Sequence, residues 1–150
     1  MRVSDLMTSN AACVRPDTPV SLIAQKMKTE NIGILPVCSD SGALLGIITD
    51  RDIVLRAVSA GQPQLTAQDI MTADPVSIMP DRNLHDACTL LAEHGVRRLP
   101  VVSGSRLIGM LSLGDIIKKP AFIDEAGDAL SAICSSSTCG RTAGTESAPS

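Results

Sequence analysis

Hydrophobic and polar positions alternate along this chain with two different periods. Four apolar residues at i, i+3, i+4 and i+7 spacing predict an amphipathic helix that starts near Asp17: Val20, Ile23, Ala24 and Met27. Short apolar runs follow at 34–38 and 44–48, and the Ser-Asp-Ser-Gly turn between them predicts a β-hairpin. A second helix is expected from Asp52 to about 61–63, where Gly and Pro end it.

The same order of elements returns about 64 residues later. Three pairs of segments carry an offset of 64 or 63: 5–8 (DLMT) with 69–72 (DIMT), 35–37 with 99–101 (LPV in both), and 46–49 (GIIT) with 109–112 (GMLS). Because these segments match in order, the chain is interpreted as an internal repeat. Each copy is predicted as strand, helix, strand, strand, helix. The expected fold class is α/β (α+β), with the two copies packed in pseudo-twofold symmetry.

The repeat also predicts the domain boundaries. Repeat one is placed at 3–62 and repeat two at 63–119. Apolar residues beyond Pro120 again fall at helical spacing, so a C-terminal helix is expected at 120–134. Residues 135–150 are almost entirely Ser, Thr, Gly, Ala and single charges, which predicts a disordered tail.

Composition narrows the classes of partner. The chain has 44% hydrophobic and 19% charged residues, which is typical of a folded globular protein. With 13 Lys and Arg against 16 Asp and Glu, and one Phe as its only aromatic residue, it lacks the basic excess and stacking rings of nucleic-acid binders. The sequence lacks the long uncharged apolar run that would predict a membrane span. Its first residues are polar where a signal peptide would be apolar, so we expect a cytoplasmic location.

The sequence lacks the motifs on which catalysis or metal binding usually depends. Phosphate-loop, dinucleotide-binding, esterase and zinc-protease motifs are all absent, so we expect no enzyme activity. Five cysteines without a paired C-x-x-C match no zinc ribbon, so no metal site is predicted. His85 and His94 are interpreted as surface residues of one helix.

The repeated motifs, taken together, resemble a pair of CBS domains, the regulatory Bateman module. The likeness covers about residues 3–119, and it is greatest to stand-alone two-domain members of the kind found in the bacterial hypoxic response. In the family, a glycine-hydrophobic-(Thr/Ser)-x-x-Asp motif binds adenosyl ligands such as AMP, ATP or S-adenosylmethionine, and we also consider NAD. The resemblance therefore implies ligand-binding residues Thr49 and Asp52 in repeat one and Ser112 and Asp115 in repeat two, in clefts between the repeats.

The two aspartates have a simpler interpretation. Asp52 and Asp115 can cap the second helices of their repeats, as any Asp at that position could. Repeat two also carries Arg97 and Arg98 before its Leu-Pro-Val strand, a position at which many family members hold the ligand phosphate. Its Leu113-Gly114 pair replaces the polar Asp50-Arg51 of repeat one.

The resemblance implies a non-catalytic sensor of an adenosyl ligand, with no required cofactor. The alternative is a stress-associated scaffold for an unidentified protein partner, with vestigial ligand sites. Apolar residues of the second helix of each repeat are expected to stay partly uncovered and to pair two chains as a homodimer. These residues are Ile53, Val54, Ala57, Val58, Ile116 and Ile117.

Cys13 and Cys38 are peculiar to repeat one, because Ser77 and Val102 occupy the equivalent positions of repeat two. A strand-helix-strand crossover makes their strands parallel neighbours, and the family likeness implies that the two thiols are bridged. Two unbridged thiols in a reducing compartment remain the alternative.

Overall fold

The computed structural model describes residues 1–61 and 64–135, which form two compact units. Unit two comprises Asn10–Pro75 and the hairpin tip Val102–Leu107; unit one comprises Met1–Ser9, Val76–Val101 and the chain from Ile108 onward. The tail predicted for 135–150 lies outside the described residues apart from Ser135, and so does most of the predicted helix end at 61–63.

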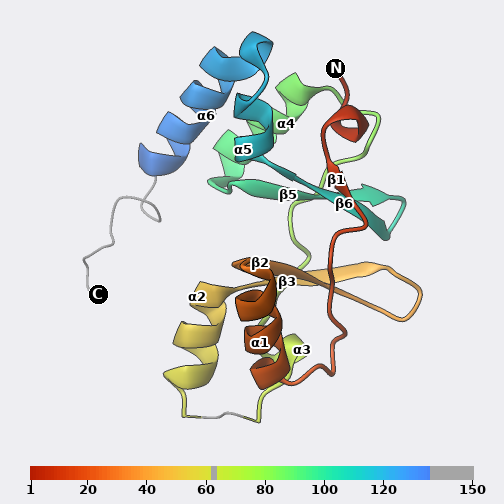
Figure 1. The fold of residues 1–150 in the computed structure, drawn as a ribbon, viewed down its shortest axis with the longest axis vertical. Coiled ribbons are helices and arrows are strands. Elements are labelled where there is room, and N and C mark those ends of the chain that lie inside the picture. Colours follow the sequence, from red (N-terminus) through yellow and green to blue (C-terminus); the bar gives the residue numbers. More distant parts are fainter. Residues whose placement is uncertain (62–63, 136–150) are drawn as a thin grey trace. The chain divides into compact units, whose positions relative to one another are not determined.

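Unit two is a small antiparallel sheet with helices on one side (Figure 1). Its strands run in the order β2-β3-β4. The elements, in chain order, are α1 (Val20–Glu30), β2 (Ile34–Cys38), β3 (Leu44–Thr49), α2 (Asp50–Asp52), which continues into the π-helical turn η2 (Ile53–Val58), α3 (Ala67–Ile70) and β4 (Thr72–Ala73). The strand expected around Cys13 is reduced to a single parallel bridge between Val14 and Val37.

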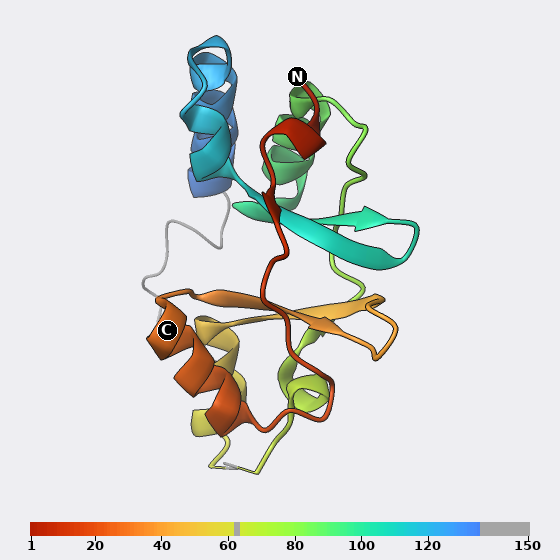
Figure 2. The ribbon, with the colours of Figure 1, turned by 45° about the vertical axis from the view of Figure 1, so that its right-hand side comes forward.

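Unit one repeats this plan and adds a helix (Figure 2). Its sheet order is β1-β6-β5, and Ile78 makes the parallel bridge to Val101. The elements are η1 (Val3–Asp5), β1 (Thr8–Ser9), α4 (Leu84–His94), β5 (Arg98–Ser103), β6 (Arg106–Ser112), α5 (Leu113–Ile117), η3 (Pro120–Phe122) and α6 (Ile123–Ser135). None of the described helices is long and apolar enough to cross a membrane.

Local sequence signals explain where the long helices begin and end. The side chain of Asn83 accepts a 2.8 Å hydrogen bond from the Asp86 amide and so caps α4, whereas Pro19 precedes α1. At the C-terminal ends, Asn31 (φ 53°) and Gly95 (φ 64°) take the left-handed conformation that closes a helix. The predicted apolar stripes form the cores, since Ile23 and Leu84 are fully buried in their units.

The opening segments of the two repeats are exchanged between the sheets. β4 opens repeat two but pairs with β3 of repeat one, and β1 opens repeat one but pairs with β6 of repeat two. A side chain at Gly109 would place its Cβ 2.7 Å from the Thr8 carbonyl oxygen, and one at Gly46 would lie 2.8 Å from that of Thr72. The glycine of each repeated motif is therefore required by the close approach of an opening strand.

Two expectations about exposed helix residues need correction. In unit two, Val54 and Val58 are exposed as expected, but Ile53 and Ala57 belong to the core. In unit one, Ile117 is 40% exposed, whereas Ile116 is fully buried. Ile116 and its counterpart Ile53 both belong to the core of their units, so the repeat itself buries this position.

Candidate functional site

The motif residues of repeat one lie at the turn from β3 into α2. Thr49 Oγ1 accepts a 3.2 Å hydrogen bond from the Asp52 amide, and Asp52 Oδ2 accepts a 2.9 Å bond from the Thr49 amide. This reciprocal pair is a capping box. The cap leaves the proton of the Thr49 hydroxyl and the Oδ1 atom of Asp52 for other partners.

Repeat two builds the same turn between β6 and α5. Ser112 Oγ accepts a 3.0 Å bond from the Asp115 amide, and Asp115 Oδ2 accepts a 3.2 Å bond from the Ser112 amide. Both side chains are half-buried, as at the first turn. The aspartates therefore take part in helix capping in both repeats, as predicted, but from the third helical position, because Thr49 and Ser112 are the N-cap residues. The role of these residues in ligand binding stays a prediction.

Arg97 and Arg98 lie directly beside the second turn. The amide of Leu113, the first residue of α5, donates a 2.8 Å hydrogen bond to the Arg97 carbonyl oxygen. This bond holds the start of β5 against the Ser112–Asp115 turn. Both arginines are exposed, and the structure therefore brings two cationic side chains and the motif of repeat two to one end of the same sheet.

The equivalent place in repeat one has the opposite charge. The Asp50 amide bonds to the Gly33 carbonyl oxygen at 3.0 Å, as Leu113 bonds to Arg97. A Cβ at Gly33 would lie 3.2 Å from Asp50 Oδ2, so an acidic side chain occupies the space beside the strand start. In repeat two the residue at the position of Asp50 is the buried Leu113. The replacement of Asp50 by Leu113 is visible in the sequence. The position of the Asp50 side chain beside Gly33 was not predicted, because it depends on a tertiary contact.

Arg56 is a site neighbour that the sequence analysis missed. Its guanidinium donates a 2.9 Å hydrogen bond to the Ile70 carbonyl oxygen, and its Nε lies 3.8 Å from Asp52 Oδ1. Arg56 thus links the first motif to α3. The i,i+4 spacing of Asp52 and Arg56 was the available signal for this pair.

The structure brings Cys13 and Cys38 together as free thiols in hydrogen-bonding contact. The Cys38 amide bonds to the Val14 carbonyl oxygen at 2.9 Å, which agrees with the predicted parallel neighbours. Cys13 is exposed, whereas Cys38 is 2% exposed. Burial, and then the adjacent Cys13, raise the pKa of the Cys38 thiol to about 12. The disulfide itself stays a prediction.

His85 has a structural partner that its surface position did not predict. Its Nδ1 lies 2.7 Å from Glu125 Oε2 in α6, and its ring is tilted against Phe122 with centroids 5.2 Å apart. Burial, and then the charge of Glu125, raise the pKa of the nearby Cys88 thiol to about 11.

Within residues 1–61 and 64–135, no group of three or more His, Cys, Asp or Glu side chains is arranged to hold a metal ion.

Comparison with known proteins identifies the class to which this fold and these turns belong. The family model described as the CBS domain matches residues 3–59 and 67–121, once for each repeat. The chain therefore belongs to the CBS-domain family and carries a pair of CBS domains. Their exchanged opening segments and capped motif turns are features of this pair.

Three known proteins show the likeness at the level of the whole pair. "CBS domain-containing protein YhcV" of Bacillus subtilis is 39% identical over 132 residues, which cover 87% of this chain and 94% of the relative. The crystal structure of Hypoxic Response Protein I, with two coordinated zinc ions, has a TM-score of 0.73 and 32% identity over 79% of this chain and 98% of that one. The crystal structure of CBSX2 in complex with AMP has a TM-score of 0.71 and 31% identity, and covers 82% of this chain and 98% of that one.

Proposed function

We propose that the chain is a non-catalytic sensor that binds an adenosyl ligand at the motif turns of its CBS domains. The observation that carries the proposal is the pairing of one hydroxyl and one carboxylate at each turn, with free hydrogen-bonding capacity left by the cap. AMP bound to the related CBSX2 supports the ligand class. Binding would regulate by favouring one conformation over another.

Each group of the second turn has a chemical role in this proposal. The Asp115 carboxylate accepts hydrogen bonds from the ribose hydroxyls, because its Oδ1 atom is not used by the cap. The Ser112 hydroxyl accepts from the Asp115 amide and keeps its own proton to donate. Arg97 and Arg98 supply guanidinium donors that match phosphate oxygens and bind them in pairs.

The first turn favours a different ligand, one without phosphate. Asp50 lies beside Gly33, where an incoming phosphate would meet a carboxylate. Asp50 is exposed, so this repulsion is on the order of 1 kcal/mol, the Coulomb energy of two unit charges about 4 Å apart in water. Thr49 and Asp52 therefore fit a nucleoside without phosphate better than a nucleotide. We accordingly assign the phosphate of AMP or ATP to repeat two, with NAD and S-adenosylmethionine as the other ligands to test.

The second candidate function is a stress-associated scaffold with vestigial ligand sites. Its support is the capping box, because a local cap alone explains the motif residues in both repeats. The likeness to Hypoxic Response Protein I favours a stress context for either function. In the scaffold, the unidentified protein partner replaces the nucleotide as the signal.

We also propose that the chain acts as a homodimer without nucleic-acid or membrane partners. Exposed apolar side chains on α1 and η2 support self-association, with Leu22 52%, Val54 56% and Val58 70% exposed. The net charge of −3 lacks the basic excess that is expected of a protein that binds a nucleic-acid backbone. The cytoplasmic location stays a prediction.

Calorimetric titration of nucleotide-free protein with AMP, ATP, NAD and S-adenosylmethionine tests the sensor. Without Trp or Tyr, the protein absorbs little near 280 nm, so an ultraviolet spectrum reports any nucleotide that remains bound. We expect saturable heat for at least one ligand. Asp115→Asn keeps an acceptor for the cap but loses the charge, and should weaken binding by about 1.5–3 kcal/mol, or about 10- to 150-fold.

Asp52→Asn is the matched variant in repeat one and should leave the affinity for AMP and ATP unchanged, because their phosphate is assigned to repeat two. Absence of heat for all four ligands, together with a clean spectrum of the purified protein, would contradict the sensor and favour the scaffold. Equal loss of affinity for AMP in both variants would contradict the assignment of its phosphate to repeat two.

A further inference from the structure

Unit two carries two side-chain contacts that the motif turns do not use. The segment before α1 runs parallel to β2, and the Cys38 amide bonds to the Val14 carbonyl oxygen at 2.9 Å. Across these two segments the thiols of Cys13 and Cys38 are in hydrogen-bonding contact. Two residues farther along both segments, Arg15 forms an ion pair with Asp40.

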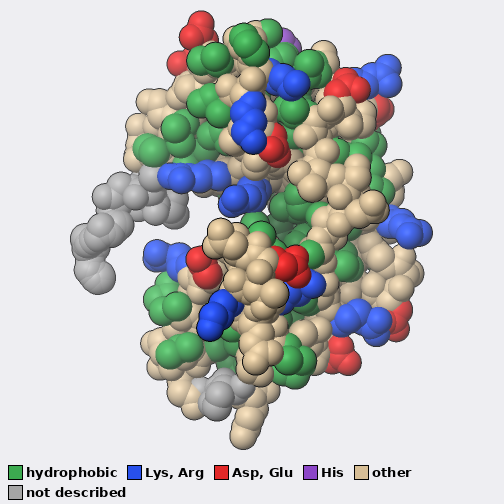
Figure 3. Space-filling view, in the orientation of Figure 1, with side chains coloured by type: hydrophobic (Ala, Val, Ile, Leu, Met, Phe, Trp, Pro, Cys, Tyr) green, Lys and Arg blue, Asp and Glu red, His purple; other side chains and the backbone are tan. Residues whose placement is uncertain are grey.

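The two contacts lie side by side at a small pocket. Side chains two residues apart on an extended segment point to the same side, so the ion pair flanks the thiols. The pocket has a volume of about 250 Å³ and is lined by residues that follow the cysteines in the sequence: Arg15, Pro16, Asp17, Ser39 and Asp40. Figure 3 shows basic and acidic side chains together at the surface beside the β2–β3 hairpin. The exposed Cys13 thus borders a pocket with charges of both signs.

Repeat two folds without these groups. Ser77 and Val102 stand at the positions of the two cysteines, and Met79 stands at that of Arg15. Repeat two still builds the same parallel bridge, by way of Ile78. The thiols and the ion pair are therefore not required by the fold of the repeat, which leaves them available for chemistry.

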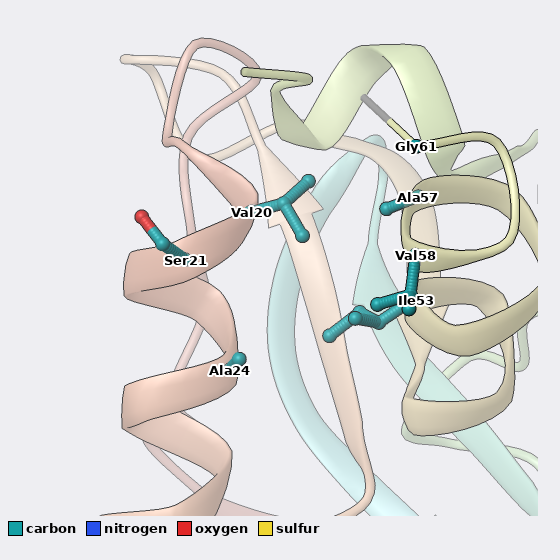
Figure 4. A pocket seen from close by; sticks show the side chains of 7 residues that line it. All are labelled: Val20, Ser21, Ala24, Ile53, Ala57, Val58 and Gly61. Atoms are coloured by element: carbon teal, nitrogen blue, oxygen red, sulfur yellow. The ribbon is translucent and has the colours of Figure 1, made fainter. Parts of the chain in front are cut away.

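Another hollow of unit two, between α1 and η2, has a different chemistry. It has a volume of about 350 Å³, and Figure 4 shows Val20 pointing toward η2, and Ile53 and Val58 pointing toward α1. No residue that lines it is charged: Val20, Ser21, Ala24, Ile53, Ala57, Val58 and Gly61. A small molecule with charged groups therefore fits the pocket beside Cys13 better than this apolar groove.

We propose that Cys13 and Cys38 form a thiol–disulfide exchange site for small disulfides with α-amino acid ends, of the cystine class. Each such end carries a carboxylate and an ammonium group. The pocket offers the guanidinium of Arg15 to the carboxylate, and the side chains of Asp17 and Asp40 to the ammonium group. This activity is separate from the adenosyl ligand proposed for the motif turns.

The exchange takes place in two steps. The Cys13 thiol loses its proton, and its sulfur attacks one sulfur of the small disulfide, whose S–S bond breaks and whose first half leaves and takes up a proton. The Cys38 thiol then gives up its proton and attacks the Cys13 sulfur, so that a Cys13–Cys38 disulfide forms and the second half leaves as a thiol. The protein dithiol is oxidised, and the small disulfide is reduced to its two thiols.

Exposure and burial assign the order of the two thiols. Cys13 is exposed, whereas Cys38 is 2% exposed, so of the pair it is Cys13 that meets an incoming disulfide. Burial, and then the charge of Cys13 and its hydrogen bond, raise the pKa of Cys38 to about 12. The charge of Cys13 is lost once its sulfur is bonded to the small molecule. The pKa of Cys38 then falls from its raised value, which prepares Cys38 for the second step.

Mass spectrometry of the reduced full chain, treated with cystine in the absence of air, tests the exchange. Peptide mapping should find cysteine attached to Cys13 first, and then a Cys13–Cys38 link with both halves of cystine released as cysteine. Cys38→Ala, which keeps the buried position small and apolar, should stop the reaction at the mixed disulfide. No attachment at Cys13, or attachment that persists in the wild type without a link, would overturn the exchange site.

Hydroxyethyl disulfide has the same S–S bond without charged ends and tests the role of the pocket. Arg15→Gln should slow the first step with cystine about two- to fivefold, the effect of up to about 1 kcal/mol for an exposed ion pair, and leave the rate with hydroxyethyl disulfide unchanged. Lys28→Gln is the matched control, because it removes one positive charge from the exposed side of α1, and it should leave both rates unchanged. Equal slowing with the two disulfides, or no slowing by Arg15→Gln, would overturn recognition by the pocket.

Discussion

Asp52 and Asp115 each combine a structural contact with a proposed binding contact. One carboxylate oxygen closes the capping box, and the other remains for a ligand or, at Asp52, faces Arg56. The sequence predicts both residues, because the Ser/Thr-x-x-Asp spacing is local. Asp50 beside Gly33 could not be predicted in this way, since it depends on where a strand start meets a helix start.

Cys13 and Cys38 should differ sharply in reactivity while reduced. A thiolate is the reactive form, and burial holds the pKa of Cys38 at about 12, whereas Cys13 is exposed. At pH 8 a thiol-alkylating reagent should modify Cys13 first, and Cys38 only on unfolding. Because the folded pKa is raised, the free thiol of Cys38 favours the folded state below pH 9 and loses that contribution as the pH rises toward 12.

Mass spectrometry of protein denatured without reductant tests the predicted disulfide between the same two residues. After air oxidation we expect a Cys13–Cys38 linked peptide and a gain in stability of about 3 kcal/mol from closure of the loop. Cys88 is a buried free thiol and serves as the control for accidental oxidation. Full alkylation of both residues would contradict the disulfide, and Cys13 would then be a free surface thiol and Cys38 a free core thiol.

The opening strands, β1 and β4, could not be predicted from the pattern of apolar residues in the sequence. The long amphipathic helices and the hairpins follow from their apolar periodicity, and their observed positions agree with it. β1 and β4 have two residues each, too few for any period, and their exchange between sheets is set by tertiary contacts. The π-helical turn at η2 likewise has no signature in the apolar pattern.

Two glycine substitutions test the account of the opening strands at this scale. Gly109→Ala places a methyl group 2.7 Å from the Thr8 carbonyl oxygen, so it should displace β1 and destabilise the fold by about 1–3 kcal/mol. Gly127→Ala meets nothing within 4 Å inside helix α6 and should stabilise the fold by about 0.5–1 kcal/mol. Urea denaturation followed by circular dichroism measures both, and the same sign for the two variants would contradict the account.

At the scale of the whole molecule, the two CBS domains have different surfaces. Repeat one has Asp50 at its motif turn, whereas repeat two has an arginine pair beside its turn and a helical face covered by α6. The family and the repeat are evident in the sequence. The difference between the two surfaces is less evident in the sequence, because the covering by α6 and the contact of Asp50 with Gly33 depend on the three-dimensional structure.

The most direct test of the central claim compares AMP with adenosine on nucleotide-free protein. Calorimetry should show tighter binding of AMP than of adenosine to the wild type. Replacing both arginines, Arg97→Gln with Arg98→Gln, should weaken AMP about 10- to 150-fold, the effect of about 1.5–3 kcal/mol for hydrogen bonds to a charged group, and leave adenosine unchanged. No saturable heat with AMP, or equal affinity for AMP in the wild type and the arginine variant, would contradict a phosphate-binding sensor in repeat two.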